Sequence, residues 1–353
     1  MSPDLGGLEL YMAKTSLFLK DAFNVTTVIN QNSKLEPYFK DKIEYTTVKK
    51  TSNIFMFRSA VKLAKLIDSK EIDLIHLHWT KDIPFVVLAK LLSKKKPKVV
   101  QSRHMTMTRF KDDFYHNFLY KNIDLILPVT MQVKEQLIKF IPSVVRPKVE
   151  VLYVGSDEGE NEEVFDLSSK SFNIGMVGRI NRDKGQHLLL NAVSLLKKKG
   201  LNINAYIVGN PMQESYLEEL KTDVKEKKLE ECFVFLGFVK NPHSFYRACD
   251  TVVLASRKET FGLVLVEAMK VGVSVIGANS GGVVEIIDDK KTGLLFESQN
   301  AESLADAIEL LYHDSELKKS IANEGQIKSN REFSNAIQFP KLANILLKVL
   351  NEG

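Results

Sequence analysis

The 353-residue chain lacks the usual marks of a secreted or membrane-spanning protein. Its two cysteines, Cys232 and Cys249, form no disulfide framework and are expected to be buried, reduced thiols. No apolar run approaches the roughly 18 residues of a membrane span. The first residues, MSPDLGGLELYM, lack the basic start and apolar core of a signal peptide. These absences predict a cytoplasmic location.

Two cofactor signatures are missing as well. No strand-like run is followed by Gly-x-Gly-x-x-Gly, the turn that a dinucleotide-dependent oxidoreductase needs. Neither cysteine has a histidine at metal-ligand spacing. The sequence therefore predicts neither a dinucleotide cofactor nor a metal site.

Charge is unevenly distributed along the chain. The net charge is +5, of which residues 1–158 carry +8 and the remainder −3. A basic half favours an anionic partner, such as a membrane surface, a polyanion or a phosphorylated substrate, but an ordinary lysine-rich surface explains it equally. Two segments are expected to bind anionic lipid peripherally at the cytoplasmic membrane face, namely KLLSKKKPK (90–98) and TRFK (108–111). We predict no nucleic-acid partner.

Apolar strand-like runs alternate with amphipathic helical patterns along the chain, which predicts parallel sheets covered on both faces. An acidic, unperiodic run after Gly155 reads as a linker. We expect an α/β protein of two doubly wound, Rossmann-like domains facing a central cleft: residues 1–158, residues 159–333, and a helix in 334–353 that packs back on the first domain. The expected strands are 24–29, 43–48, 73–78, 98–102, 125–129 and 149–153, then 172–178, 204–209, 233–238, 251–256, 274–278 and 292–296.

The stretch SRKETFGLVLVEAMK, residues 256–270, carries two acids around an apolar run. Glu259 is expected on a loop after a strand, and Glu267 in a helix that begins near Gly262 and ends before Gly272. Open parallel sheets bind ligands beyond the carboxyl ends of their strands, and a helix N-terminus attracts anions. An ionised carboxylate on each side of such a site suits sugar hydroxyls, although both acids could equally be plain surface residues.

Three further segments follow expected strands or precede a helix. GMVGRINRDKG places two cations, Arg179 and Lys184, where they could bind phosphate. DLGG puts Gly6 and Gly7 before a helical pattern, and SRHMTMTR puts His104 after a strand. Each signal is weak alone, because loop cations, a flexible terminus and a structural histidine would look the same.

Taken together, these segments resemble the retaining, nucleotide-sugar-dependent glycosyltransferases of the GT-B fold, of the group 1 and family 4-like type. The resemblance covers nearly the full chain, and its most specific part is SRKETFGLVLVEAMKVGVSVIGANSGGVVEIIDDKKTGLLF with its Glu-x7-Glu spacing. It implies a sugar transfer from a nucleotide diphosphate sugar to a hydroxyl acceptor, in the synthesis of cell-surface polysaccharide or glycolipid. The implied partners are that donor and a lipid-linked or glycan acceptor, with no other cofactor.

The resemblance also implies roles for matching positions. Arg179 and Lys184, beside Gly178, would bind the donor diphosphate, Glu267 the ribose hydroxyls and Glu259 the transferred sugar. Catalytic roles would fall to Glu259, His104, Arg179 and Lys184. The other implied donor contacts are Gly7, the base-cradling Phe238 and Val239, and the segment Phe261, Gly262 and Leu263.

The implied chemistry needs positive groups at the leaving diphosphate. The chain has no Asp-x-Asp, the motif that holds a divalent ion in metal-dependent transferases, so Arg179, Lys184 and a helix N-terminus are expected to replace the ion. Retention by front-face attack uses no protein nucleophile, and the leaving phosphate takes the acceptor's proton.

The chain also departs from the family pattern. The family has a strand just before the diglycine loop, whereas Met1 lies five residues from Gly6, so we expect a truncated start. YVGSD stands where the family has Asn-Gly-Val-Asp. Two alternatives stay open: a nucleotide-sugar 2-epimerase on the same fold, and a non-catalytic partner subunit of a transferase.

Overall fold

The computed structural model describes residues 7–48, 54–157, 159, 165–167 and 170–352. The chain divides into two compact units, one formed by Met1–Gly155 with Ala336–Gly353 and the other by Ser156–Asn335. Each unit is an α/β structure with parallel strands, as predicted. Gly6 and half of the expected linker lie outside the described residues. No helix in the described part is long and apolar enough to cross a membrane.

The first unit contains six of the predicted strands. They are β1 (Thr27–Asn30), β2 (Tyr45–Val48), β3 (Leu74–Leu77), β4 (Lys98–Arg103), β5 (Leu125–Pro128) and β6 (Lys148–Val149). The helices are α1 (Gly7–Leu19), α2 (Glu36–Phe39), α3 (Ile54–Ser69), α4 (Ile83–Leu92), α5 (Phe114–Lys121), α6 (Met131–Phe140) and α14 (Asn335–Asn351), with a 3-10 turn η1 (Thr80–Asp82).

The described strands of this unit form two separate sheets. β1 pairs only with β2, and a second sheet has the order β3-β4-β5-β6, so no described strand joins β1 to β3. All pairs are parallel. Buried backbone groups of a parallel sheet are normally paired, and β1 and β3 each have one edge that no described strand pairs.

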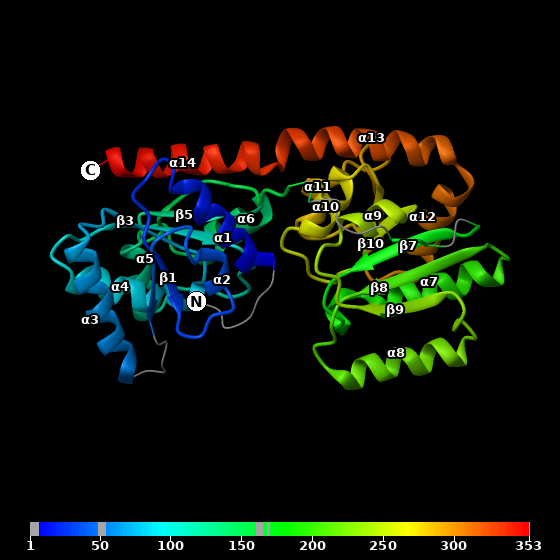
Figure 1. Cartoon of the computed structure of the whole chain (residues 1–353), viewed down its shortest axis with the longest axis horizontal. Coiled ribbons are helices and arrows are strands. Elements are labelled where there is room, and N and C mark those ends of the chain that lie inside the picture. Colours follow the sequence, from blue (N-terminus) through cyan, green and yellow to red (C-terminus); the bar gives the residue numbers. More distant parts are fainter. Residues whose placement is uncertain (1–6, 49–53, 158, 160–164, 168–169, 353) are drawn as a thin grey trace. The chain divides into compact units, whose positions relative to one another are not determined.

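The C-terminal helix α14 contributes to the core of the first unit. Leu342 and Ile345 are buried in one cluster with Val100, Leu125 and Leu127 of the sheet. Figure 1 shows α14, in red, running along this unit. The apolar spacing of NAIQFPKLANILLKVL is therefore used for packing on the strands.

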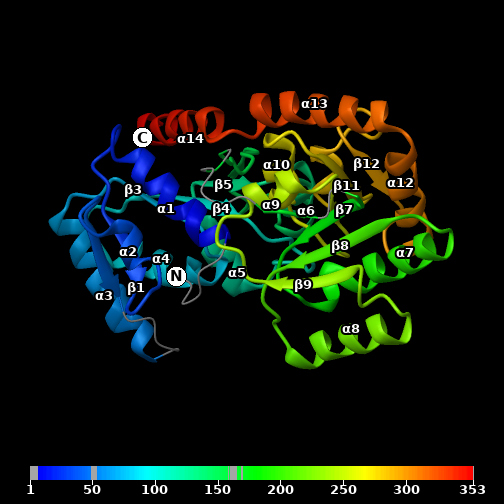
Figure 2. The same ribbon diagram turned by 45° about the vertical axis from the view of Figure 1, so that its right-hand side comes forward.

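The second unit is built on one six-stranded parallel sheet with the order β12-β11-β10-β7-β8-β9. Figure 2 shows β8 and β9 side by side in this sheet, with α8 on one side of them. The strands are β7 (Phe172–Val177), β8 (Ile203–Val208), β9 (Phe233–Gly237), β10 (Thr251–Leu254), β11 (Ser274–Ala278) and β12 (Leu294–Phe296). The helices are α7 (Gln186–Lys198), α8 (Glu214–Glu226), α9 (His243–Ala248), α10 (Leu263–Lys270), α11 (Val283–Ile286), α12 (Ala301–His313) and α13 (Ser315–Glu332), with a 3-10 turn η2 (Arg182–Lys184).

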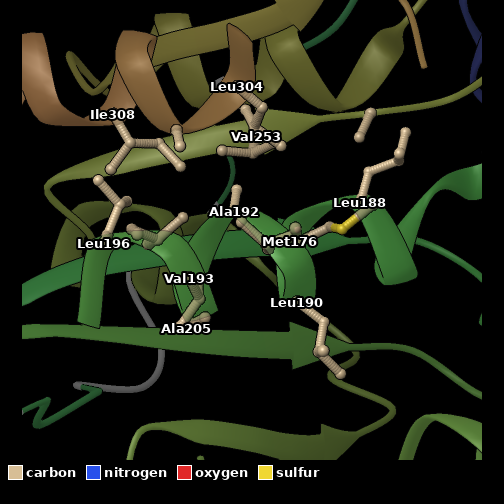
Figure 3. Close-up of a cluster of buried hydrophobic side chains, with 14 of the residues drawn as sticks. Met176, Leu188, Leu190, Ala192, Val193, Leu196, Ala205, Val253, Leu304 and Ile308 are labelled. Atoms are coloured by element: carbon tan, nitrogen blue, oxygen red, sulfur yellow. The ribbon is translucent and has the colours of Figure 1, made fainter. Parts of the chain in front are cut away.

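The core of the second unit explains why its strands read as continuous apolar runs. Both faces of the sheet are covered by helices, so the side chains that point to either face are buried. Figure 3 shows Val193 and Leu196 of α7, Ala205 of β8, and Leu304 and Ile308 of α12 within this cluster. The strand order changes direction between β10 and β7, which places the loops after these two strands next to each other.

Candidate functional site

The loop after β10 carries Glu259, as predicted from the sequence. Its side chain is 17% exposed, and the chain turns at Gly262, with φ +104°, into α10. That φ favours glycine, and a Cβ at this position would lie 3.3 Å from Ile286 and Leu254. The first N–H groups of α10 have no acceptor within their own helix, so this end of the helix suits an anion.

The loop after β7 carries Lys184 to the same place. The Asn181 side chain accepts a hydrogen bond from the Lys184 backbone N–H at 3.0 Å and so caps the turn η2. Gly185, with φ +82°, lies so close to β10 that a Cβ would stand 2.2 Å from the Ala255 carbonyl oxygen. The Lys184 ammonium donates to Glu259 Oε2 at 2.8 Å. Two predicted site residues from different loops therefore form a direct ion pair.

Arg179 lies at the beginning of the same loop. Its side chain is exposed, and its carbonyl oxygen accepts a hydrogen bond from Gln186 Nε2 at 3.1 Å. The guanidinium makes no ion pair with any residue that the structure describes. Gly178 just before it has φ +152°, with open space where a Cβ would stand. An exposed guanidinium at the carboxyl end of β7 is free to take a phosphate oxygen.

Glu267 projects from α10 and is held by a buried tyrosine. The Tyr246 hydroxyl donates to Glu267 Oε2 at 3.0 Å. Burial, and secondarily the nearby Glu267 carboxylate, raise the pKa of Tyr246 well above its usual value, so it stays a donor. Sequence reasoning missed Tyr246, because nothing in the sequence links α9 to α10.

A glycine pair supports the Glu259 loop and was also missed as part of the site. Gly282 donates its backbone N–H to the Glu259 carbonyl oxygen at 3.0 Å. A Cβ on Gly281 would stand 2.1 Å from that oxygen, and a Cβ on Gly282 would stand 2.2 Å from the Thr260 carbonyl oxygen. The loop after β11 therefore fixes the backbone of the loop after β10, and only glycine fits there.

Four further predicted contacts differ in character. Phe238, after β9, is 68% exposed, and Val239 beside it is half-buried, so both can be reached by a ligand. Phe261 is 5% exposed, and its ring packs on Phe333 at 5.7 Å between centroids. The Phe261 side chain is thus structural, whereas Leu263 follows Gly262 at the first position of α10.

In the first unit, the structure places Gly7 at the exposed start of α1 and His104 directly after β4. His104 belongs to a half-buried group of side chains that sequence reasoning missed. His104 Nε2 lies 3.2 Å from His78 Nδ1, and the Tyr11 ring meets both histidines edge-on. His76, two residues before His78 in IHLHW, contacts Ser102 Oγ at 2.8 Å. Period-two spacing on β3 was the available signal.

The histidine group is neutral at ordinary pH. Burial lowers the pKa of His76 to about 4 and the pKa of His104 to about 3, and it lowers the pKa of His78 as well. A neutral imidazole can hydrogen-bond a hydroxyl but carries no charge for a phosphate. No cluster of three or more His, Cys, Asp or Glu side chains suited to a metal ion occurs among the described residues.

Two family models match the chain. Residues 157–328 match the model described as Glycosyl transferases group 1, and residues 3–130 match the model Glycosyl transferase 4-like. The chain belongs to the group 1 glycosyltransferases. The glycosyltransferase family predicted from the sequence is confirmed, whereas retention and the nucleotide-sugar donor stay predictions.

Curated relatives and solved structures agree with this family. The glycosyltransferase is 29% identical over 218 residues to the capsular polysaccharide biosynthesis glycosyltransferase CapM of Staphylococcus aureus, a match that covers 58% of this chain and 57% of CapM. It is 30% identical to the N-acetylgalactosamine-N,N'-diacetylbacillosaminyl-diphospho-undecaprenol 4-alpha-N-acetylgalactosaminyltransferase of Campylobacter jejuni, over 67% of this chain and 62% of that one. The chain thus spans under two thirds of these relatives.

The solved structure of Anabaena Alr3699/HepE in complex with UDP-glucose superposes with a TM-score of 0.82 at 22% identity, covering 99% of this glycosyltransferase and 98% of that chain. At this identity the similarity shows a shared fold. It is the GT-B fold, as predicted.

Proposed function

We propose that this glycosyltransferase transfers a hexose from a nucleotide diphosphate sugar to a hydroxyl acceptor, with retention of anomeric configuration and without a metal ion. The observation that carries the proposal is the Lys184–Glu259 ion pair at 2.8 Å, formed by the loops after β7 and β10. The Anabaena protein of the same fold was solved with UDP-glucose, which supports a nucleotide-sugar donor.

The donor diphosphate would be bound by cations and a helix end. Lys184, 29% exposed, is positioned to exchange its carboxylate partner for a phosphate oxygen. Arg179 adds a guanidinium that can fork onto two phosphate oxygens. The start of α10 supplies backbone N–H donors through Gly262 and Leu263. Negative charge grows on the leaving diphosphate in the transition state, so these fixed positive groups lower the barrier.

Glu259 and Glu267 would recognise hydroxyls rather than attack carbon. Glu267, held by Tyr246, is an acceptor for the ribose hydroxyls, and Glu259 for hydroxyls of the transferred sugar. In a front-face reaction the acceptor oxygen bonds to the anomeric carbon while the sugar–phosphate bond breaks. The acceptor proton passes to the leaving phosphate oxygen. The roles of Gly7, His104, Phe238 and Val239 stay predictions.

The acceptor is proposed to be lipid-linked or a glycan. The names of CapM and of the Campylobacter enzyme refer to capsular polysaccharide and to a diphospho-undecaprenol substrate. The segment 105–118 of the first unit suits a lipid interface, since it carries exposed aromatic and basic side chains. Its exposed members include Met105, Arg109, Phe110, Phe114, Tyr115 and Phe118.

The decisive experiment has a binding arm and a transfer arm. A thermal-shift screen against UDP-, GDP- and ADP-sugars identifies the donor, and transfer is then measured with a lipid-linked acceptor in the presence of EDTA. Product with an unchanged anomeric centre, unaffected by EDTA, supports the proposal. Isomerisation of the donor at C2 without an acceptor would instead identify an epimerase. Absence of donor binding would identify a non-catalytic partner.

The membrane contact has a separate test. Co-sedimentation with vesicles containing anionic phosphatidylglycerol should fall when salt is raised, and Phe114→Ser should weaken it, because Phe114 is 88% exposed. Replacing Ile327, which is 48% exposed on α13 of the second unit, by serine is the control. Equal binding by all three proteins, or partitioning unaffected by salt, would contradict the contact.

A further inference from the structure

A buried lysine in the second unit has no part in the proposed chemistry. Lys328 lies on α13, and only 8% of its side chain is exposed. Its ammonium donates to Asp288 Oδ1 at 3.0 Å and to the Glu285 carbonyl oxygen at 3.2 Å. Burying an ammonium is costly, and an apolar residue of similar volume often packs as well or better. The two partners therefore indicate what the charge is used for.

Both partners lie at the carboxyl end of a very short helix. α11 has only four residues, Val283–Ile286, and Asp288 lies in the loop after it. A helix of this length is not stable by itself, and its last carbonyl groups have no donor within the helix. Lys328 supplies a donor and a positive charge at this end, where both are favourable. It thereby ties α11 to α13, which Figure 1 shows next to each other.

The amino end of α11 and one of its side chains hold the loop that carries Glu259. Gly282, just before α11, donates its backbone N–H to the Glu259 carbonyl oxygen at 3.0 Å. Gly262 ends the loop, and a Cβ there would lie 3.3 Å from Ile286 Cδ1. Ile286 is fully buried, so α11 cannot shift without repacking its surroundings. The position of α11 therefore fixes this loop at two points.

We propose that Lys328 is a positioning residue for Glu259, because it fixes α11 and α11 fixes the loop after β10. The distance bridged is short, since four helical residues rise by about 6 Å. A shift of α11 moves the Glu259 carboxylate away from Lys184 and from the hydroxyls of the transferred sugar. The inference rests on the proposed role of Glu259 in sugar binding, but neither hydrogen-bond partner of Lys328 belongs to the proposed donor site.

Hydrogen exchange tests the structural part of the inference. Lys328→Met keeps the length of the side chain and removes the ammonium. Exchange in peptides covering residues 257–263 should then become roughly tenfold faster, because the loop opens locally more often. The matched control is Lys318→Met on the same helix, whose ammonium pairs with Asp250 at the opposite end of β10 from Glu259. Equal exchange in the wild type and Lys328→Met, or equal acceleration in both variants, overturns the inference.

A second variant separates this effect from a general loss of stability. Asp288→Ala leaves Lys328 in place and removes one of its two acceptors, and the half-exposed Asp288 side chain is not part of the core. We expect acceleration of exchange in residues 257–263 here as well, by a smaller factor. All variants are compared at a temperature at which circular dichroism shows them folded. Acceleration spread evenly over the whole unit, rather than centred on the loop, overturns the inference.

Sugar transfer tests whether Lys328 acts through Glu259. With the donor found in the thermal-shift screen, kcat/KM of Lys328→Met should fall roughly tenfold or more. Binding of the nucleoside diphosphate without its sugar should change by less than about twofold, since Glu259 is assigned to the sugar. In a Glu259→Ala background, Lys328→Met should cause no further loss of transfer. Full additivity of the two substitutions overturns the inference.

Failure of the proposed function is distinguishable from failure of this inference. Wild-type transfer by Glu259→Ala would refute the sugar-binding role of Glu259, and the exchange measurement would still decide whether Lys328 holds the loop. Reduced transfer by Glu259→Ala, together with wild-type transfer by Lys328→Met, would overturn this inference alone.

Discussion

Lys184 Nζ lies 2.8 Å from Glu259 Oε2, although the two residues are 75 positions apart in the chain. The pair is partly screened from water, with 29% and 17% of the two side chains exposed. The charges therefore balance each other when no anion is bound. A diphosphate that takes Lys184 leaves Glu259 free to accept hydrogen bonds from sugar hydroxyls.

Loss of the lysine charge should reduce turnover more than it reduces stability. We expect Lys184→Ala, and likewise Arg179→Ala, to lower kcat by roughly 10²–10³-fold, equivalent to about 3–4 kcal/mol of transition-state stabilisation. The measurement is steady-state sugar transfer at saturating donor.

Arg182 provides the matched control, because it is a cation in the same turn that pairs instead with Glu219. Arg182→Ala should leave kcat within about twofold, since exposed ion pairs contribute little. Wild-type turnover in both Lys184→Ala and Arg179→Ala would contradict the assigned roles.

The Tyr246 hydroxyl should affect donor binding through Glu267. Tyr246→Phe removes the 3.0 Å hydrogen bond and keeps the buried ring. We expect KM for the donor to rise several-fold with little change in kcat, and unfolding free energy to fall by about 1 kcal/mol. Tyr206→Phe is the control. It removes a hydroxyl that accepts a hydrogen bond from Asn204 elsewhere in the unit. An unchanged donor KM in Tyr246→Phe would argue against a positioning role.

Gly282 should be sensitive to a single methyl group. Its φ of −73° is accessible to any residue, so the effect of Gly282→Ala comes only from the 2.2 Å approach to the Thr260 carbonyl. The displaced loop carries Glu259, and we expect at least a roughly tenfold fall in kcat/KM with the fold retained by circular dichroism. Gly200→Ala, with φ +84° and open space, should cost about 1 kcal/mol of stability and no activity. Equal activity losses in the two variants would refute the steric explanation.

The three clustered histidines should make the first unit sensitive to acid. Their pKa values are lowered in the folded chain, to about 4 for His76 and about 3 for His104, so the unfolded chain binds protons first as pH falls below 6.5. Stability is unaffected above pH 6.5 and decreases between pH 6.5 and about 4, by up to about 1.4 kcal/mol per pH unit for each histidine. Urea unfolding across this range measures the slope.

A histidine variant tests whether the pH dependence of stability comes from these three histidines. His104→Asn should reduce the pH dependence by the share of one histidine, because it removes one group whose pKa is lowered by folding. The same slope in wild type and His104→Asn would place the acid sensitivity elsewhere.

Twelve strands were predicted from the sequence, and all twelve are present within a few residues of the expected bounds. Continuous apolar runs made them visible, because strands covered on both faces bury every side chain. β6 is much shorter than expected, with only Lys148 and Val149 paired. Pairing partners leave no such local pattern, so the strand order in each sheet came from the structure.

By itself, the sequence determined the family, the strand–helix order and the loops that carry Glu259, Lys184 and Arg179, since these depend on local periodicity and on residues next to strand ends. Only the tertiary structure decided that Lys184 meets Glu259, that Tyr246 holds Glu267 and that Gly281 and Gly282 support the loop. It also brought His76, His78 and His104 together and left β1 and β3 in separate sheets. These features depend on contacts between segments distant in the chain, which packing of the whole unit selects and no short stretch encodes.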